Sequence, residues 1–164
     1  SPSVVIADVH SAPGGQWNDS YDFVRLHQPS AGYGVETERL EPEGDAEHLA
    51  SREEILEYYQ RVVDKLRDEH GTVFVGKTKV DLSESGFVPV SDDDGRGVGW
   101  KCRLQRVGDG AESTIVVRKR LVDARYLQPD LPVDTKPTFK YDGSKTPCVP
   151  INDLVDPSFT SNNE

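Results

Sequence analysis

The sequence lacks several features that mark common classes of protein. It contains no methionine and two cysteines in 164 residues, and no apolar run approaches the roughly 20 residues that a membrane-spanning helix needs. Asp and Glu number 29 against 19 Lys and Arg, which gives a net charge of -10. Because phosphate binding depends on clustered Lys and Arg, this balance argues against nucleic acid as a partner. A soluble protein with no membrane partner is expected.

The start of the chain also lacks a recognisable leader. Residues 1–3 read Ser-Pro-Ser, with neither an initiator methionine nor a basic segment followed by an apolar one. A cytoplasmic location and a longer parent chain are the resulting expectations.

No metal site is expected either. Cys102 and Cys148 stand far apart, and neither forms a CxxC pair or lies beside a histidine at ligand spacing. They are interpreted as buried or unreactive thiols, since free cysteine is among the most buried residue types. The acidic run at 92–94 lacks the alternating ligand spacing of a calcium loop. The remaining candidate ligands are scattered along the chain: His10, His48 and His70.

The composition that is present suits one turn-rich α/β domain. Hydrophobic residues make up 35 % of the chain, with 14 Gly and 11 Pro. The apolar run Val4–Asp8 predicts a strand buried on both faces of a parallel sheet. The next 30 residues contain no helical pattern but several aromatic residues, so a long functional loop is a better interpretation than disorder.

A helix is predicted after this loop. Ser51 and Glu54 form the S-x-x-E capping box, and Gly71 supplies the stop. Between them, apolar residues recur every three or four positions and predict one core-facing stripe. The stripe consists of Ile55, Tyr58, Tyr59, Val62, Val63 and Leu66.

Strands are predicted beyond the helix. The β-branched segment 72–82 predicts a single strand. Alternation at Trp100, Cys102 and Leu104, a glycine turn at 108–110 and alternation on its far side predict an antiparallel hairpin inside a β insertion at about 86–122. Residues 121–124 are predicted to form a further strand, and the proline-rich remainder is predicted to be an extended linker.

One segment resembles a known family. Asp8, followed by Gly14-Gly15-Gln16-Trp17, is similar to the D/E-x(n)-G-G-x-W stretch of flavin-containing and Baeyer-Villiger monooxygenases. The resemblance implies that Asp8 binds the FAD ribose and that residues 14–17 line the FAD. The chemistry agrees, because a carboxylate accepts from ribose hydroxyls and glycine lets the backbone approach a cofactor closely.

The resemblance extends to about residue 150. The segment 23–30, followed by Tyr33-Gly34-Val35, resembles a loop that lies against the flavin, which implies roles for Arg25, His27 and Gln28. The Tyr58-Tyr59 pair falls where a branch of the family has an E-I-x-x-Y-Y helix. The resemblance also implies that Val80 contacts the adenine through its backbone and that Ala124 stands in a turn under the FAD.

Three departures from the family pattern are visible. The G-x-G-x-x-G motif belongs about 20 residues before the ribose acid, yet only seven residues precede Asp8. The family's Ala-Thr-Gly turn is replaced by Asp123-Ala124-Arg125-Tyr126, whose larger side chains cannot pack as closely. A second glycine motif, for NAD(P)H, would follow residue 150 and is absent.

The resemblance therefore implies a partial Rossmann-type FAD-binding domain at 1–150 with an antiparallel β-hairpin insertion, and a linker at 151–164 toward an NAD(P)H-binding domain. The implied function is that of a fragment of an FAD- and NAD(P)H-dependent oxidoreductase, monooxygenase-like, acting on a small organic substrate. No side chain of this chain is expected to act as a catalytic acid or base, since the flavin carries the chemistry.

Other interpretations stay open. The chain could be a non-catalytic remnant or interaction module that keeps the fold without FAD, or a different nucleotide-binding enzyme such as a methyltransferase. Asp8 alone could be an ordinary acid at a strand end, and Trp17 alone could be a core residue. His27 could be a loop histidine that only makes hydrogen bonds, since no nucleophile motif accompanies it.

Overall fold

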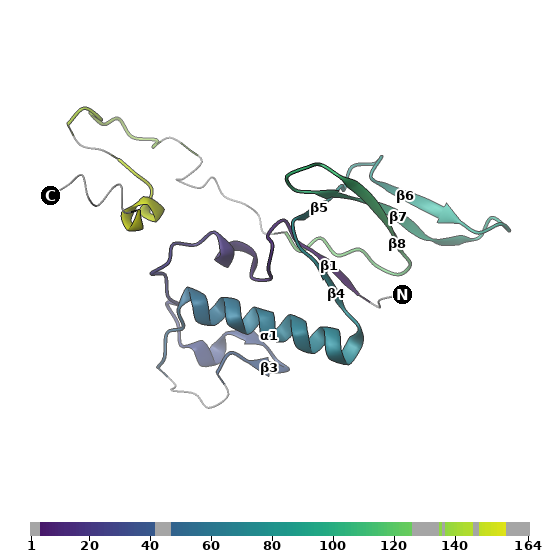
Figure 1. Ribbon diagram of the computed structural model, residues 1–164, viewed down its shortest axis with the longest axis horizontal. Coiled ribbons are helices and arrows are strands. Elements are labelled where there is room, and N and C mark those ends of the chain that lie inside the picture. Colours follow the sequence, from purple (N-terminus) through teal and green to yellow (C-terminus); the bar gives the residue numbers. More distant parts are fainter. Residues whose placement is uncertain (1–3, 42–46, 126–134, 136, 146–147, 157–164) are drawn as a thin grey trace.

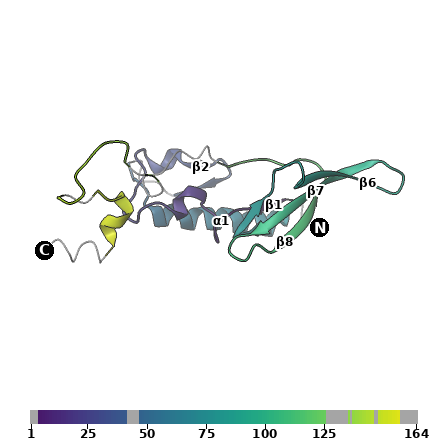
Figure 2. The ribbon, with the colours of Figure 1, turned by 90° about the horizontal axis from the view of Figure 1, so that it is seen from above.

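The computed structural model describes residues 4–41, 47–125, 135, 137–145 and 148–156. They form an α/β structure of mixed helix and strand content (Figure 1). A long helix, α1 (Arg52–His70), lies beside a short parallel pair of strands, and an antiparallel sheet extends beyond that pair (Figure 2). Among the described residues, no helix has both the length and the apolar character needed to cross a bilayer.

The parallel pair consists of β1 (Val5–Ala7) and β4 (Val73–Val75), with Val5 opposite Val73 and Ala7 opposite Val75. The prediction that β1 is buried on both faces is wrong for this structure, because its residues are only partly buried and Val4 is 50 % exposed. The physical reason is that β4 is its sole strand partner in the described part of the chain.

The predicted irregular segment after β1 is largely irregular in the structure. It contains two 3₁₀ turns, η1 (Gly15–Asn18) and η2 (Ser30–Gly32), and a hairpin of β2 (Gly34–Val35) with β3 (Glu38–Arg39). Backbone bonds fasten it to the start of α1, since the Leu26 amide donates to the Ala50 carbonyl at 2.9 Å.

The predicted helix is confirmed together with both of its ends. The Ser51 hydroxyl accepts from the Glu54 amide at 3.3 Å, and the Glu54 carboxylate accepts from the Ser51 amide at 2.6 Å. Gly71 ends the helix at φ 64°, a left-handed conformation that glycine adopts without steric cost. Two residues of this helix, Ile55 and Tyr58, are buried in one hydrophobic cluster with Leu26, Leu40 and Ala50 from the chain before it.

The prediction of a single strand over 72–82 is wrong, because the chain bends between β4 and β5 (Thr78–Val80). Lys77 has φ 50°, and a Cβ on Gly76 would stand 2.6 Å from the Ser11 carbonyl oxygen. The loop after β1 therefore lies in close contact with this bend. As a result, β4 pairs in parallel with β1, whereas β5 pairs antiparallel with β7 (Gly97–Arg106).

The predicted antiparallel hairpin is confirmed. It is formed by β7 and β8 (Glu112–Val117), with Trp100 opposite Val117. The strand β6 (Phe87–Ser91) pairs with β7 on the edge that β5 also uses, so β7 is the central strand of this sheet. The Cys102 thiol is buried on β7, in agreement with its prediction, while Cys148 is exposed; neither is in a disulfide.

Residues 121–124 do not form the predicted strand. Val122 is 76 % exposed and Leu121 37 %, and no described strand lies alongside to pair with them. Within the predicted linker, Ile151–Val155 forms a 3₁₀ helix, η3. Other parts of the predicted linker, residues 126–134, 136, 146–147 and 157–164, lie outside the described residues.

Candidate functional site

Asp8 stands where β1 ends. Its amide donates to the Val75 carbonyl at 3.1 Å, and its own carbonyl accepts from the Thr78 amide at 2.8 Å. These bonds place the Asp8 carboxylate at the carboxyl end of the parallel pair, and its side chain is 27 % exposed. In open α/β sheets this edge is where ligands bind.

His10 holds the carboxylate of Asp8. One oxygen, Asp8 Oδ1, lies 2.8 Å from the His10 amide nitrogen and 2.7 Å from His10 Nδ1. The other ring nitrogen, Nε2, lies 2.7 Å from Asp19 Oδ2. Because ionised carboxylates only accept hydrogen bonds, two carboxylates around one ring favour the imidazole form that donates from both nitrogens. Burial lowers the pKa of His10, but the bonds to Asp19 and Asp8 outweigh it, and the pKa is raised.

The two glycines of the predicted FAD turn have different surroundings. Gly14 has φ 130°, and a Cβ there would lie 2.5 Å from Leu56 Cδ2 on α1. Gly14 is therefore needed for packing against the helix. Gly15 has φ 52°, and a Cβ there would meet nothing within 4 Å. Gly15 thus offers backbone to open space, which is the property a cofactor-binding turn requires.

The turn is attached firmly to α1. Arg52 donates from Nε to the Trp17 carbonyl at 2.9 Å and from Nη2 to the Asn18 carbonyl at 3.0 Å. The Trp17 indole donates to the Tyr33 hydroxyl at 2.9 Å, and its ring packs against the buried core. Trp17 therefore has a structural role in the described chain, whereas Gln16 is exposed.

Arg25, His27 and Gln28 all lie on the surface near the start of α1. Arg25 forms an isolated bridge with Ser51, and its guanidinium donates to the Leu49 carbonyl at 3.0 Å. These contacts make Arg25 part of the junction that leads into the helix.

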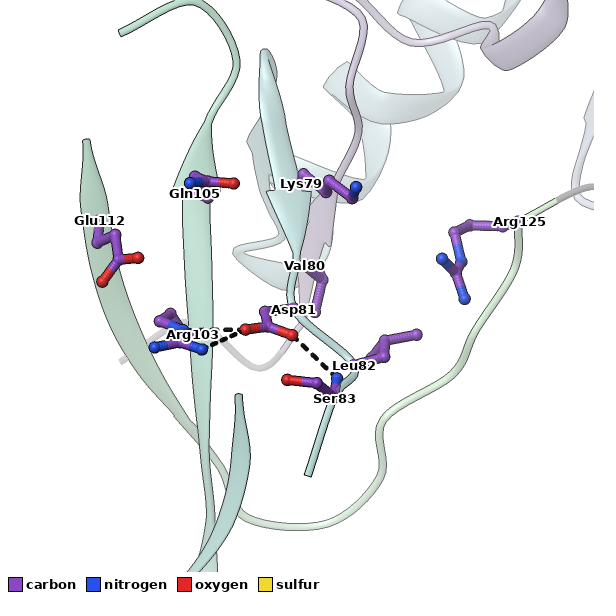
Figure 3. Close-up of a pocket in the computed structure, with 9 residues that line it drawn as sticks. All are labelled: Lys79, Val80, Asp81, Leu82, Ser83, Arg103, Gln105, Glu112 and Arg125. Atoms are coloured by element: carbon purple, nitrogen blue, oxygen red, sulfur yellow. Dashed lines mark hydrogen bonds and ion pairs between the residues drawn. The ribbon is translucent and has the colours of Figure 1, made fainter. Parts of the chain in front are cut away.

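Val80 lines a pocket of about 500 Å³ between β5, β7 and the segment after β8 (Figure 3). Arg125 also lines this pocket, whereas the predicted site residue Ala124, its neighbour in the chain, is not among the lining residues. The lining does not include Asp8 or the turn at 14–17. The residues around the pocket are Lys79, Val80, Asp81, Leu82, Ser83, Arg103, Gln105, Glu112 and Arg125.

Charges within this pocket are largely paired. Arg103 Nε lies 3.0 Å from Asp81 Oδ2, and the Ser83 amide donates to Asp81 Oδ1 at 2.9 Å. Hydrogen bonds from Ser83 and Arg103 lower the pKa of Asp81 to about 2. Arg125, in turn, pairs with Asp123 at 2.7 Å.

Sequence reasoning missed His10 and Asp19 as members of the site. The D-x-H spacing of Asp8 and His10 was the available signal, since a side chain two residues beyond a strand-end acid can turn back onto it. Asp19 could not be paired with His10 from spacing, because their contact depends on the fold of the intervening turn.

Comparisons with known proteins identify three relatives, and each of them is described as an uncharacterized protein. The chain is 32 % identical over 137 residues to uncharacterized proteins of Mycobacterium bovis (Mb2023) and of two strains of Mycobacterium tuberculosis (MT2056 and Rv2000). Each match covers 79 % of this chain but only 22 % of the relative, so the chain spans about a fifth of the length of these relatives. No family model matches the chain, and no solved structure matches it significantly.

Proposed function

We propose that this chain is part of an FAD-dependent, NAD(P)H-using oxidoreductase of the monooxygenase type, and that it contributes a portion of a Rossmann-type FAD-binding domain. The observation that carries the proposal is the position of Asp8 at the carboxyl end of a parallel strand pair, linked through His10 to a diglycine turn. A carboxylate at this position is what a dinucleotide's ribose requires.

The residues present fit an adenosine ribose. Both hydrogen bonds to the Asp8 carboxylate fall on Oδ1, and within the described residues none falls on Oδ2. That oxygen is available to accept from a ribose hydroxyl. Gly15, in the turn that His10 and Asp19 link to Asp8, presents backbone to open space without a side chain to block a ligand.

FAD, when bound, would supply the redox chemistry by accepting a hydride from NAD(P)H and passing electrons to oxygen. The residues of this chain would bind and orient it. Asp8 and Gly15 would hold the adenosine half, and Arg25, His27 and Gln28 would lie toward the flavin or pyrophosphate. Val80 would contact the adenine, and Ala124 would stand in a turn under the FAD. None of these residues has to donate or remove a proton in the reaction.

The open edge of β1 supports a larger parent sheet. Its residues are partly buried and pair with β4 alone in the described part of the chain, which leaves one row of backbone groups for another parallel strand. This chain matches only 22 % of each relative, which leaves ample chain in the relatives for such strands and for an NAD(P)H domain.

A second candidate is a non-catalytic module that retains the fold without FAD. Gly14 and Trp17 favour it, because both already have structural reasons in packing against α1 and the core. Packing does not explain Asp8 and Gly15 in the same way. For this reason we prefer the FAD-binding oxidoreductase to the non-catalytic module.

A comparison of two flavins tests the proposal. FMN carries the isoalloxazine but lacks the adenosine, so a site built around the adenosine ribose should bind FAD at least tenfold more tightly. Calorimetric titration of the purified chain with FAD and with FMN measures both affinities, and a visible spectrum reports retained flavin. Equal affinities, or no binding of FAD, would contradict the proposal and favour the non-catalytic module.

A further inference from the structure

Three side chains form a continuous hydrogen-bonded row beside the proposed ribose site. Asp8 Oδ1 lies 2.7 Å from His10 Nδ1, and Asp19 Oδ2 lies 2.7 Å from His10 Nε2. The His10 side chain is 21 % exposed, whereas Asp19 is 67 % exposed. The imidazole is thus the inner member of the row, held at both ends.

This row fixes the orientation of the Asp8 carboxylate. A free aspartate side chain rotates and presents either oxygen, but two bonds on Oδ1 hold that oxygen toward His10. The ring is held in turn by Asp19, whose amide donates to the Gln16 carbonyl at 3.2 Å. His10 therefore connects the end of β1 to the turn that contains Gly15.

We propose that His10 is a positioning residue for a nucleotide sugar: it holds Asp8 Oδ1 so that Oδ2 faces the vicinal hydroxyls of the ribose. The inference rests on the proposed function and adds to it a residue that touches no atom of the cofactor. Locking such a group by a supporting hydrogen bond is what a precise site needs.

The charged groups around His10 are consistent with this role. Asp8 at the end of β1 and Asp19 after η1 both face the ring, and Lys77 at the bend after β4 donates its amide to the His10 carbonyl at 2.7 Å. Arg52 on α1 is engaged by carbonyls of η1 and by Asp22. Two carboxylates facing one imidazole favour the doubly protonated ring that donates to both.

Two substitutions of His10 distinguish its bond to Asp8 from its bond to Asp19. In His10→Asn the amide nitrogen can take the place of Nδ1 and keep the bond to Asp8, but it cannot reach Asp19. In His10→Gln the longer side chain can take the place of Nε2 and reach Asp19, but it loses the bond to Asp8. A residue that only ties the turn in place would tolerate Gln better, whereas a residue that orients Asp8 tolerates Asn better.

The experiment is a calorimetric FAD titration of the wild-type chain, H10N, H10Q and D8N at pH 6, with folding checked by circular dichroism. We expect H10N to bind within about threefold of wild type, and H10Q to bind on the order of tenfold more weakly, which is the cost of one charge-assisted hydrogen bond. D8N should lose at least as much as H10Q.

Each other outcome has a definite meaning. Equal affinities of H10N and H10Q, or weaker binding by H10N, overturn this inference while leaving the proposed function intact if D8N is weakened. Absence of FAD binding by wild type overturns both. Should H10Q fail to fold, ¹⁵N NMR of the wild-type ring decides: the Nδ1 proton must remain bonded in the FAD complex, and its loss overturns the inference.

Discussion

The Asp8 carboxylate and the His10 imidazole are joined through a single oxygen, since Asp8 Oδ1 accepts both the His10 amide at 2.8 Å and His10 Nδ1 at 2.7 Å. This arrangement separates the two oxygens of one carboxylate into different roles. Oδ1 belongs to the internal structure of the loop, and Oδ2 accepts no hydrogen bond from the residues that the structure describes. Under the proposed function, the protein therefore orients this carboxylate before a ligand binds.

Alanine substitutions at the two glycines of the turn should lower the free energy of unfolding by different amounts. Gly14→Ala places a Cβ 2.5 Å from Leu56 Cδ2 at φ 130°, so we expect a loss of about 2 to 3 kcal/mol in the free energy of unfolding. Gly15→Ala meets open space at φ 52° and should cost only about 1 kcal/mol. Urea unfolding measures both.

The same pair discriminates packing from cofactor binding. Gly15→Ala should remain folded yet bind FAD at least tenfold more weakly, because its methyl group enters the space assigned to the cofactor. Wild-type affinity in the folded Gly15→Ala chain would show that the turn does not contact FAD.

The capping box of α1 should be worth a measurable part of the stability. Ser51→Ala removes the acceptor of the Glu54 amide, and a cost of about 1 kcal/mol is expected in urea unfolding. Gln60→Ala, at an exposed position of the same helix, is the matched control and should change stability by less than about 0.5 kcal/mol. Equal effects of the two substitutions would mean that the cap contributes nothing.

The Tyr58 hydroxyl should stabilise the β2–β3 hairpin against α1. It accepts from the Val35 amide at 2.7 Å and donates to the Glu38 carbonyl at 2.8 Å, in a fully buried residue. Tyr58→Phe keeps the ring and leaves both backbone groups without this partner, so a loss of about 1 to 2 kcal/mol is expected. Tyr21→Phe serves as the control, and a matching loss there would rule out the hydrogen bonds as the cause.

The stability of the chain should fall as the pH rises above 6.5. The pKa of His10 is raised in the folded state above its ordinary value of 6.5 by its bonds to Asp19 and Asp8, against the opposing effect of burial. Its contribution is therefore complete below pH 6.5 and is lost as the pH rises through the folded pKa. Urea midpoints between pH 5.5 and 8.5 should show this decline, and Asp19→Asn should reduce it. A decline of the same size in Asp19→Asn would assign it to another group.

Local signals in the sequence predicted the elements that local physics determines. Ser51, Glu54 and Gly71 marked both ends of α1, and the alternation around Trp100 predicted the β7–β8 hairpin, because caps and side-chain period are encoded in neighbouring residues. The single strand over 72–82 was wrong since its break depends on the loop at His10 and Ser11 pressing on Gly76. No local sequence pattern predicts that contact, because it joins residues far apart in the chain.

The candidate site was predictable in part for the same reason. Asp8 and Gly15 follow from a strand end and a tight turn, both visible in the sequence. The link from His10 to Asp19 and the joining of Val80 with Arg125 in one pocket required the tertiary structure. The strand expected at 121–124 has no described strand beside it. Its apolar pattern does not determine whether a partner strand exists.

The most direct test of the central claim combines one protein change with one ligand change. Wild type and Asp8→Asn are each titrated with FAD and with an FAD whose adenosine ribose lacks the 2′-hydroxyl. If Asp8 Oδ2 accepts from that ribose, either change alone weakens binding on the order of tenfold, and both together weaken it no further than one alone. Asp8→Asn binding FAD as tightly as wild type, or the two losses simply adding, would contradict the account.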